Sequence, residues 1–285
     1  MESAPLEVCH PPHLLNAQPF AEFRGLAVSW RPESGIKLDV SKTLMTIAKA
    51  QQTASFGPVI DAKPAQRPRA TTLEGRVVRM VPLDPVAHAG ALFDATRGEE
   101  NEQLWLYLFE GPFATRAAFD SHLQQKASSE DPLFFAIVDK SSGDAVGYAS
   151  YLRIEPAHRV IEVGNILYTP GLQRTIGATE AMYLMARHVF EDLGYRRYEW
   201  KCNALNAPSR KAALRLGFTF EGVFRQHMMV KGRNRDTAWF SMLDSEWPKR
   251  KAAFERWLAP SNFEEDGRQK VLLSAMHSEV ENVGL

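Results

Sequence analysis

The segment that decides the fold is residues 160–181, which read VIEVGNILYTPGLQRTIGATEA. An apolar run that carries one acid, Glu162, ends at Pro170, a short turn follows, and a helix then opens with small residues. Backbone N–H groups at the start of a helix have no partners inside it, and they point outward together with the positive end of the helix dipole. A strand–turn–helix junction of this kind can hold a phosphate group.

The totals of the chain limit the classes of partner. Lys plus Arg and Asp plus Glu both number 34, so no net charge draws the chain toward nucleic acid or an anionic membrane surface. No apolar run approaches the roughly 20 residues of a membrane span, and the N-terminus does not resemble a secretory signal. The two cysteines form no cluster with metal-ligand spacing. We therefore expect no bound metal and a reducing, cytoplasmic location.

The distribution of proline divides the chain. Residues 1–70 hold eight of the 17 prolines and show little hydrophobic periodicity, so they bury too little surface to offset the entropy of ordering. We predict a largely disordered extension over residues 1–70, with a helical piece near residues 42–52. The alternative is a gene model that starts too early, with Met45 as the true start. Residues 71–248 are predicted to form the folded domain, and residues 249–285 a helical tail.

Hydrophobic periodicity and turn residues predict the elements of the folded domain. The expected strands cover residues 76–82, 133–138, 145–154, 160–168, 197–202, 218–224 and 237–243. The expected helices cover residues 85–96, 113–128, 179–193, 206–216 and, in the tail, 249–258. Strands outnumber helices and alternate with them only in part, so we expect a mixed α/β fold with a mostly antiparallel, twisted sheet flanked by helices. The charged side chains of the run 196–201 are expected to face outward.

The segment 160–181 resembles motif A of the GCN5-related N-acetyltransferases (GNAT), in which the turn grips the pyrophosphate of coenzyme A. In that family Gln or Arg is followed, after two residues, by Gly, one further residue, and Gly or Ala. Gln173 and Ala178 match, but Ile176 stands at the first Gly position. Ile would be strained there if φ must be positive and tolerable if the position is helical. The resemblance implies a cofactor-binding set of Gln173, Arg174, Thr175, Gly177, Ala178 and Thr179; the alternative is an ordinary helix start.

A second stretch, residues 202–225, reads CNALNAPSRKAALRLGFTFEGVFR and resembles motif B of the Rim-type branch of this superfamily, which includes enzymes that acetylate N-termini of ribosomal proteins. The resemblance covers roughly residues 72–247. It implies that Asn206 binds the pantetheine arm, or caps its own helix, and that Ser209 donates a proton to the departing thiolate. A serine at a helix start is also a common cap. Ala213 fills the place of a tyrosine that many relatives use as the acid.

An amine must lose a proton before it can attack a thioester, and neutralising an amine of pKa near 10 at pH 7 costs about 4 kcal/mol. The resemblance places Glu162, eleven residues before Gln173, where several members keep a general base. Desolvation in an otherwise apolar strand would raise its pKa toward the working range. The alternative is an acid on an edge strand that faces solvent or pairs with Arg153 or Arg159.

The acceptor cleft is expected to have a wall formed by the loop 153–159 and by four aromatic residues, Trp105, Tyr107, Phe109 and Phe113; the alternative is that these aromatic residues belong to the core. The resemblance implies an N-acetyltransferase that uses acetyl-coenzyme A (acetyl-CoA) as cosubstrate and acts on a primary amine of a small molecule. The alternatives are a protein N-terminus as acceptor, or a non-catalytic module that holds an acyl-CoA, which Ile176 and Ala213 would favour. A homodimer is compatible with the sequence.

Overall fold

The computed structural model describes residues 57–282. The chain divides into two compact units, Met1–Ile60 and Asp61–Leu285. The extension predicted to be disordered covers residues 1–70; its part up to residue 56, the helical piece near residues 42–52 and the alternative start at Met45 lie outside the described residues. Residues 57–70 are described and have no helix or strand, and the amides of Ala65 and Gln66 donate to the carbonyls of Pro156 and Leu193. The second unit carries the sheet and its helices, and everything below concerns this unit.

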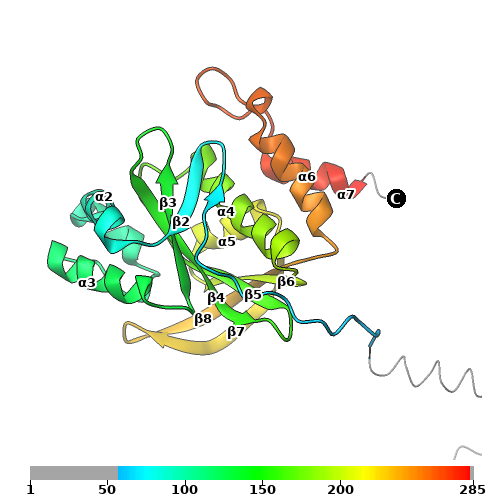
Figure 1. Cartoon of the computed structure of the whole chain (residues 1–285), viewed down its shortest axis with the longest axis horizontal. Helices are drawn as coiled ribbons and strands as arrows, with labels where there is room; N and C mark the ends of the chain where they lie inside the picture. The colour runs from blue at the N-terminus through cyan, green and yellow to red at the C-terminus, as the bar shows by residue number, and fades with distance from the viewer. Residues whose placement is uncertain (1–56, 283–285) are drawn as a thin grey trace, which may run out of the picture. The chain divides into compact units, whose positions relative to one another are not determined.

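Within residues 57–282, eight strands form one sheet in the order β1-β2-β3-β4-β5-β6-β8-β7 (Figure 1). Neighbouring strands run antiparallel except β5 and β6, which are parallel. This arrangement confirms the predicted mixed α/β fold with a mostly antiparallel sheet. The strands are β1 (Leu73–Glu74), β2 (Val78–Pro82), β3 (Leu133–Asp139), β4 (Ala145–Glu155), β5 (Val160–Tyr168), β6 (Arg197–Asn203), β7 (Thr219–Val230) and β8 (Arg233–Leu243).

Helices cover both faces of the sheet. Helices α2 (Pro85–Thr96) and α3 (Arg116–Ala127) lie on one face, and α4 (Ile176–Arg187) and α5 (Ala207–Arg215) lie on the other (Figure 1). The tail forms α6 (Trp247–Leu258) and α7 (Leu273–Asn282) beside α4 and α5. The short elements are η1 (Glu99–Trp105), η2 (His188–Asp192), which continues α4 as a π-helix, and η3 (Pro260–Asn262).

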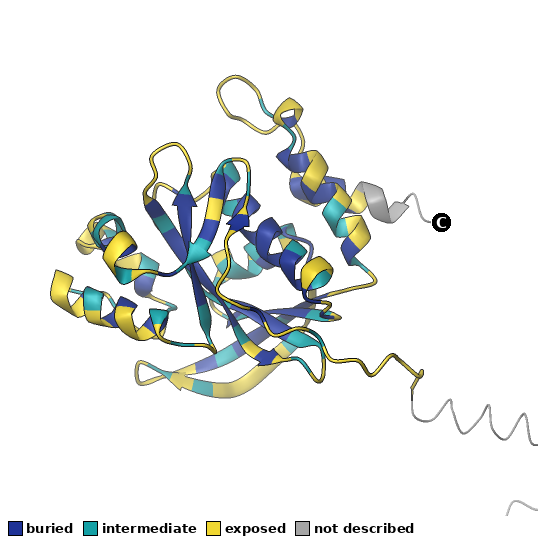
Figure 2. Ribbon diagram, viewed as in Figure 1, coloured by how far each residue is buried: buried dark blue, intermediate teal, exposed yellow. Residues whose placement is uncertain are grey.

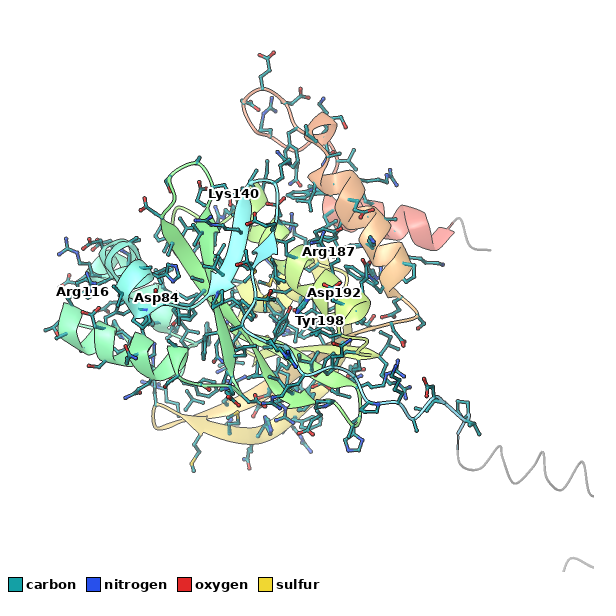
Figure 3. All side chains as sticks on the ribbon, viewed as in Figure 1. Asp84, Arg116, Lys140, Arg187, Asp192 and Tyr198 are labelled. Atoms are coloured by element: carbon teal, nitrogen blue, oxygen red, sulfur yellow. The ribbon has the colours of Figure 1, made fainter. Side chains whose placement is uncertain are left out.

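Local sequence explains where these helices begin. Asp84 caps α2 by accepting a hydrogen bond from the Val86 amide at 2.8 Å, and Pro85 occupies the first turn (Figure 3). Helix α4 begins three residues before its predicted start, because Thr175 caps it by accepting from the Ala178 amide. The small residues that precede the expected stripe therefore belong to the helix.

The sheet separates two apolar cores (Figure 2). The core on the α2–α3 face includes Leu92, Trp105, Phe119, Leu123, Phe134 and Tyr148. The larger core packs the other face against α4, α5 and the tail helices, and it includes Met80, Ile161, Val163, Leu184, Tyr198 and Phe254. Successive side chains of a strand point to opposite faces, so Ile161 and Val163 place the side chain of Glu162, between them, on the α2–α3 face.

The prediction that the charged side chains of residues 196–201 face outward is wrong for β6. Glu199 is only 6% exposed, and the Lys201 side chain only 4%. They are buried because β6 is a central strand, with β5 on one side and β8 on the other. Their charges are compensated by each other, by Glu162 of β5 and by Arg197 of β6 itself.

Candidate active site

A notch opens between β5 and β6, where their pairing stops. The parallel register runs from Val160 opposite Arg197 to Val163 opposite Trp200, and the two strands have no paired residues beyond that point. On the other side of β5, Ala149 of β4 faces two residues, Asn165 and Ile166, and Asn165 has φ of 50°. This β-bulge bends β5. The C-terminal half of β5 therefore offers a free backbone edge to the notch.

The predicted phosphate turn lies directly after this half of β5. Among the described residues, the amide N–H groups of Arg174, Ile176 and Gly177 have no hydrogen-bond acceptor. The first amides of a helix carry partial positive charge, and their free hydrogens suit an anion. The backbone of the turn thus has donors free for an anion, and the pyrophosphate site stays a prediction of the sequence.

The departure at Ile176 does not strain the turn. Ile176 is the first residue of α4 and does not have a positive φ; the left-handed position is Arg174, with φ of 63°. The Ile176 side chain packs against the larger core. Position 176 is therefore helical and does not require a positive φ, so an isoleucine is acceptable there.

The side chains of the turn mainly hold the turn itself. Gln173 donates to the Tyr168 carbonyl at 3.2 Å, and the Thr175 hydroxyl donates to the Leu172 carbonyl at 2.7 Å. Gly177 is needed for packing, since a Cβ there would lie 2.8 Å from Cγ1 of Val78. Two further bonds tie the start of α4 to its surroundings: Tyr168 donates to the Ala178 carbonyl at 3.1 Å, and Arg215 donates to Thr179 Oγ1 at 3.0 Å.

Asn206 and Ser209 lie at the start of α5, on the α4 side of β6. Asn206 accepts from the Ser209 amide at 3.1 Å and so caps the helix. The Ser209 hydroxyl accepts from the Trp200 indole at 3.0 Å. It also lies close to Cys202. Burial raises the pKa of the Cys202 thiol, and the opposing effect of a hydrogen bond with Ser209 is smaller. Ala213, at the place of the tyrosine of relatives, is fully buried.

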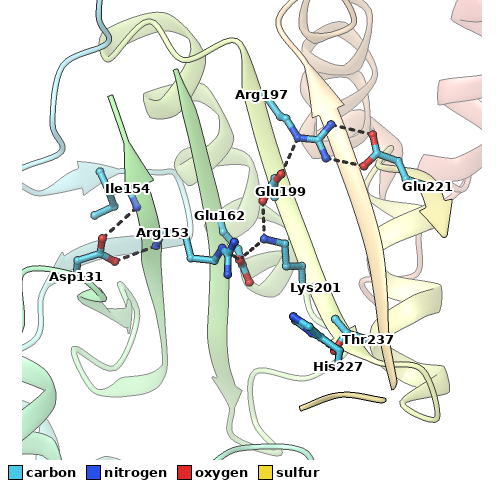
Figure 4. A network of polar contacts seen from close by, with 10 residues as sticks. All are labelled: Asp131, Arg153, Ile154, Glu162, Arg197, Glu199, Lys201, Glu221, His227 and Thr237. Carbon is cyan, nitrogen blue, oxygen red and sulfur yellow. Dashed lines mark hydrogen bonds and ion pairs between the residues drawn. The ribbon is translucent and has the colours of Figure 1, made fainter. Parts of the chain in front are cut away.

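Glu162 belongs to a row of alternating charges across β4, β5, β6 and β7 (Figure 4). Lys201 Nζ lies 2.9 Å from Glu162 Oε2 and 2.6 Å from Glu199 Oε2. Arg153 extends the row at one end, 3.5 Å from Glu162, and Arg197 at the other, 2.6 Å from Glu199. Arg197 also forms a two-bond pair with Glu221. The predicted alternative of an ion pair with Arg153 is therefore present, but β5 is not an edge strand.

The two carboxylates that share Lys201 have opposite pKa shifts. Burial raises the pKa of Glu162, and the opposing effects of Lys201 and Arg153 are smaller. Burial acts in the same direction on Glu199, but hydrogen bonds from Lys201 and Arg197 hold the pKa of that carboxyl below its usual value. Environments that push two pKa values apart assign different roles to two acids. Here Glu162 is the group suited to exchange a proton, while Glu199 stays ionised.

Glu162 and Ser209 lie on opposite faces of the sheet. Glu162 contacts Lys201, whereas Ser209 contacts Trp200, the preceding residue of β6, whose side chain points to the other face. Glu162 is one residue before the last paired position of β5, at the mouth of the notch. The two predicted catalytic residues can therefore act only from the two sides of a group that lies in the notch.

The loop of residues 106–115, between η1 and α3, covers the Glu162 face of the sheet and is called the covering loop below. The Tyr107 hydroxyl donates to the Leu205 carbonyl at 3.1 Å, next to Asn206. Lys231, at the tip of the β7–β8 hairpin, donates to the carbonyls of Trp105 and Gly111 at 2.8 and 3.0 Å. Of the predicted aromatic wall, Trp105 is buried in the core and Phe113 packs against its ring at 5.2 Å.

Strands β7 and β8 border a hollow. A bulge on β7 between Phe224 and Met228 borders an open hollow of about 760 Å³, lined by Phe224, Arg225, Gln226, His227, Asn234 and Asp236. The Phe224 ring packs on Trp239 at 4.5 Å, and His227 Nδ1 lies 2.9 Å from Thr237 Oγ1.

The sequence did not single out three residues of this face: Lys201, Trp239 and Arg235. Lys201 lies 3.7 Å from the centroid of the Trp239 ring, and Arg235 is buried although it is an arginine. Thr237 and Trp239 occupy alternate positions of the predicted strand 237–243, whereas Arg235 lies before that strand. That pattern alone does not separate an outward face from a site.

Comparisons with known proteins agree with this geometry. A family model described as "Acetyltransferase (GNAT) domain" matches residues 78–219. A solved structure of a GCN5-related N-acetyltransferase from Brucella melitensis is 51% identical, covers 76% of this chain and 99% of its own, and superposes with a TM-score of 0.75. A probable GNAT-family acetyltransferase from Chromobacterium violaceum ATCC 12472 is 40% identical over 67% of this chain and 96% of its own, with a TM-score of 0.63. The chain therefore belongs to the GNAT superfamily, whose members use acetyl-CoA as the acetyl donor.

Curated relatives match over shorter stretches. The "Ribosomal-protein-serine acetyltransferase" of Escherichia coli (strain K12) is 31% identical over 83 residues, which are 29% of this chain. It supports the likeness to the Rim-type branch. The "Uncharacterized N-acetyltransferase p20" of Bacillus licheniformis is 29% identical over 113 residues, or 40% of this chain. The chain spans 46% of the length of the first and 63% of the second.

Residues 57–282 contain neither a candidate membrane span nor a candidate metal site. None of the helices in residues 57–282 combines the length and apolar character needed to cross a bilayer. The same part of the chain holds no group of three or more His, Cys, Asp or Glu side chains arranged to bind a metal ion.

Proposed function

We propose that this protein transfers the acetyl group of acetyl-CoA to a primary amine of a small molecule. One observation carries the proposal: a turn with free amides leads out of a notch between diverging strands, and Glu162 lies at the mouth of that notch. The turn would hold the pyrophosphate and the notch the pantetheine arm. Its free β5 edge could pair with the amides of that arm much as a strand does. The bound cosubstrate supplies an acetyl thioester.

Glu162 would take the proton that an ammonium must lose before its nitrogen can attack. The neutral amine then attacks the thioester carbon, the carbon–sulfur bond breaks, and the nitrogen loses its second proton to solvent, from which Ser209 recovers the proton that it gives to the thiolate; Glu162 releases its own proton to solvent afterwards. The Ser209 hydroxyl, oriented by the Trp200 indole, would supply a proton to the thiolate from the other side of the notch. Held in this geometry, the two reactants need little further ordering to react.

A protein N-terminus is the second candidate acceptor, because the E. coli relative is named as an acetyltransferase of a ribosomal protein. Against it, the bonds from Tyr107 and Lys231 tie the covering loop down over the acceptor side. An extended polypeptide needs more room than a small amine. The cytoplasmic location and the homodimer stay predictions.

The substitution Glu162→Gln tests the proposal. With purified full-length protein, acetyl-CoA and a panel of amines, thiol release should fall about 10²- to 10⁴-fold, since a carboxamide cannot accept the proton. The Michaelis constant for acetyl-CoA should change little, because the phosphate turn is untouched. Glu265→Gln is the matched control, since Glu265 lies exposed in the loop between η3 and α7, outside the candidate site. Wild-type turnover in Glu162→Gln would reduce Glu162 to a structural ion-pair partner.

The pH profile adds a second readout. Because burial raises the pKa of Glu162, its protonated, inactive form persists to higher pH than for an ordinary glutamate. Wild-type activity should therefore decline on the acid side at a pH above the usual carboxyl range, and this limb should disappear in Glu162→Gln. Tight acetyl-CoA binding without thiol release for any amine would instead indicate a non-catalytic binding module.

A further inference from the structure

Arg235 is a buried cation without a counter-ion. It lies in β8 and is only 8% exposed. Within the described residues its guanidinium makes no ion pair and no hydrogen bond, and Nε has no acceptor. The guanidinium lies 5.3 Å from the centroid of the Phe109 ring in the covering loop. Buried charges in proteins are nearly always paired, because removing them from water is costly.

The guanidinium belongs to the acceptor side of the sheet. Arg235, Thr237 and Trp239 alternate along β8 and point to one face. The Trp239 ring lies against Lys201, which pairs with Glu162, so this face is the Glu162 face. Burial lowers the pKa of Arg235, and the opposing effects of Cys202 and Glu162 are smaller. Because Glu162 affects this pKa, Arg235 lies within electrostatic range of the notch.

The ion pairs of the row in Figure 4 do not include Arg235. Three carboxylates alternate with three cations in the row of Figure 4, namely Glu162, Glu199 and Glu221 with Arg153, Lys201 and Arg197. Arg235 adds a further positive charge that none of these carboxylates contacts. The indole nitrogen of Trp239 on the same face also lacks an acceptor within the described residues. The face is therefore short of one anion and of hydrogen-bond acceptors.

We propose that Arg235 binds a carboxylate of the acceptor, so that the acceptor is a small molecule with both a primary amine and a carboxylate, as in an amino acid. The planar guanidinium matches a carboxylate with two parallel hydrogen bonds. The phosphates of the cosubstrate do not suit this role, because the phosphate turn starts α4 on the opposite face. This inference rests on the proposed acetyl transfer.

The experiment compares matched acceptors. Wild-type full-length protein, Arg235→Met and Arg235→Lys are assayed with the common L-amino acids, each beside its α-amide, which keeps the amine but lacks the carboxylate. In the wild type, kcat/KM for the best amino acid should exceed that for its amide. Arg235→Met should lower kcat/KM for the amino acid about 30-fold or more, with little change in kcat/KM for its amide. Arg235→Lys should retain part of the preference. Arg233→Met, two residues earlier on β8 and exposed, is the control and should leave the ratio unchanged.

A binding arm separates failure of this inference from failure of acetyl transfer. Calorimetry of the same amino acids with wild-type protein saturated with coenzyme A needs no turnover, and Arg235→Met should abolish their heat. If amines are acetylated but acids and amides perform equally, the carboxylate subsite is wrong while the function stands. If no amino acid binds the wild type, the inference is wrong whatever the turnover. An equal loss for acids and amides in Arg235→Met would make Arg235 a structural residue.

Discussion

The two halves of the site are built from different chemical groups. On the α4 side, free backbone amides face the expected phosphates, and the side chains of Gln173 and Thr175 hold the turn in place. On the opposite face, buried charged side chains from several strands form the floor. One half therefore depends on the path of the chain, and the other on the identity of each side chain.

This difference explains how the two halves can tolerate change. A backbone donor survives a change of side chain as long as the turn keeps its shape, and Ile176 at a family glycine position is such a case. A buried charge cannot be changed alone, because its partner is then left uncompensated. Mutations should therefore affect mainly cofactor affinity in the first half, and stability or acceptor choice in the second.

The largest effect is expected for Lys201→Met. This change leaves the carboxylates of Glu162 and Glu199 without their shared cation, and breaking a buried ion pair from one side typically costs about 3–5 kcal/mol. The free energy of unfolding, measured with urea, should fall by that amount at neutral pH. The loss should shrink as the pH falls, since protonated carboxyls need no cation.

Lys140→Met is the matched control for Lys201. Lys140 pairs with Glu74 at 3.2 Å, but both side chains are largely exposed. Pairs of this kind contribute at most about 1 kcal/mol. Equal losses for the two lysines would mean that the row of charges on the acceptor side is no more structural than a surface pair, and the contrast between the halves would fail.

The strand, turn and helix of the α4 side were predictable from sequence because their signals are local. The strand 160–168, the turn and the capped helix lie within some twenty consecutive residues, and β5 has the predicted bounds. Motif B is equally local: Asn206 caps α5 as one of its two predicted roles. What local patterns obscured was only the start of α4, where Thr175 and Gly177 read as a turn.

The acceptor half could not be predicted in the same way, because its contacts depend on strand register. Alternation along β6 puts Glu199 and Lys201 on one face but cannot say whether that face is covered. The covering groups come from elsewhere in the chain: Glu162 from β5 and Trp239 from β8. Arg235 became conspicuous only when the packing showed that it is buried without a partner.

A smaller effect is expected for Gly177→Ala, which tests the shape of the turn. The added Cβ would meet Cγ1 of Val78, a stiff side chain, at 2.8 Å. Overpacking of this kind costs about 1–3 kcal/mol, which the higher helix propensity of alanine offsets by up to about 1. The start of α4 should move away from β2, and calorimetry should show weaker acetyl-CoA binding. Gly171→Ala lies in the same turn, but its added Cβ would be 4.0 Å from Thr169 Oγ1. This control should change neither the free energy of unfolding nor the affinity for acetyl-CoA.

The smallest expected effect concerns two threonine caps with the same geometry. Thr175 caps α4 and Thr115 caps α3, and each accepts from the amide three residues later at 3.3 Å. Replacing either by alanine should lower the free energy of unfolding by about 1 kcal/mol. Only Thr175→Ala should also weaken acetyl-CoA binding, by several-fold, because its hydroxyl joins the Leu172 carbonyl to the Ala178 amide across the turn. Unchanged or tighter binding would show that the freed Ala178 amide restores the affinity lost by loosening the turn. Binding on the α4 side would then depend on the number of free amides more than on their fixed arrangement.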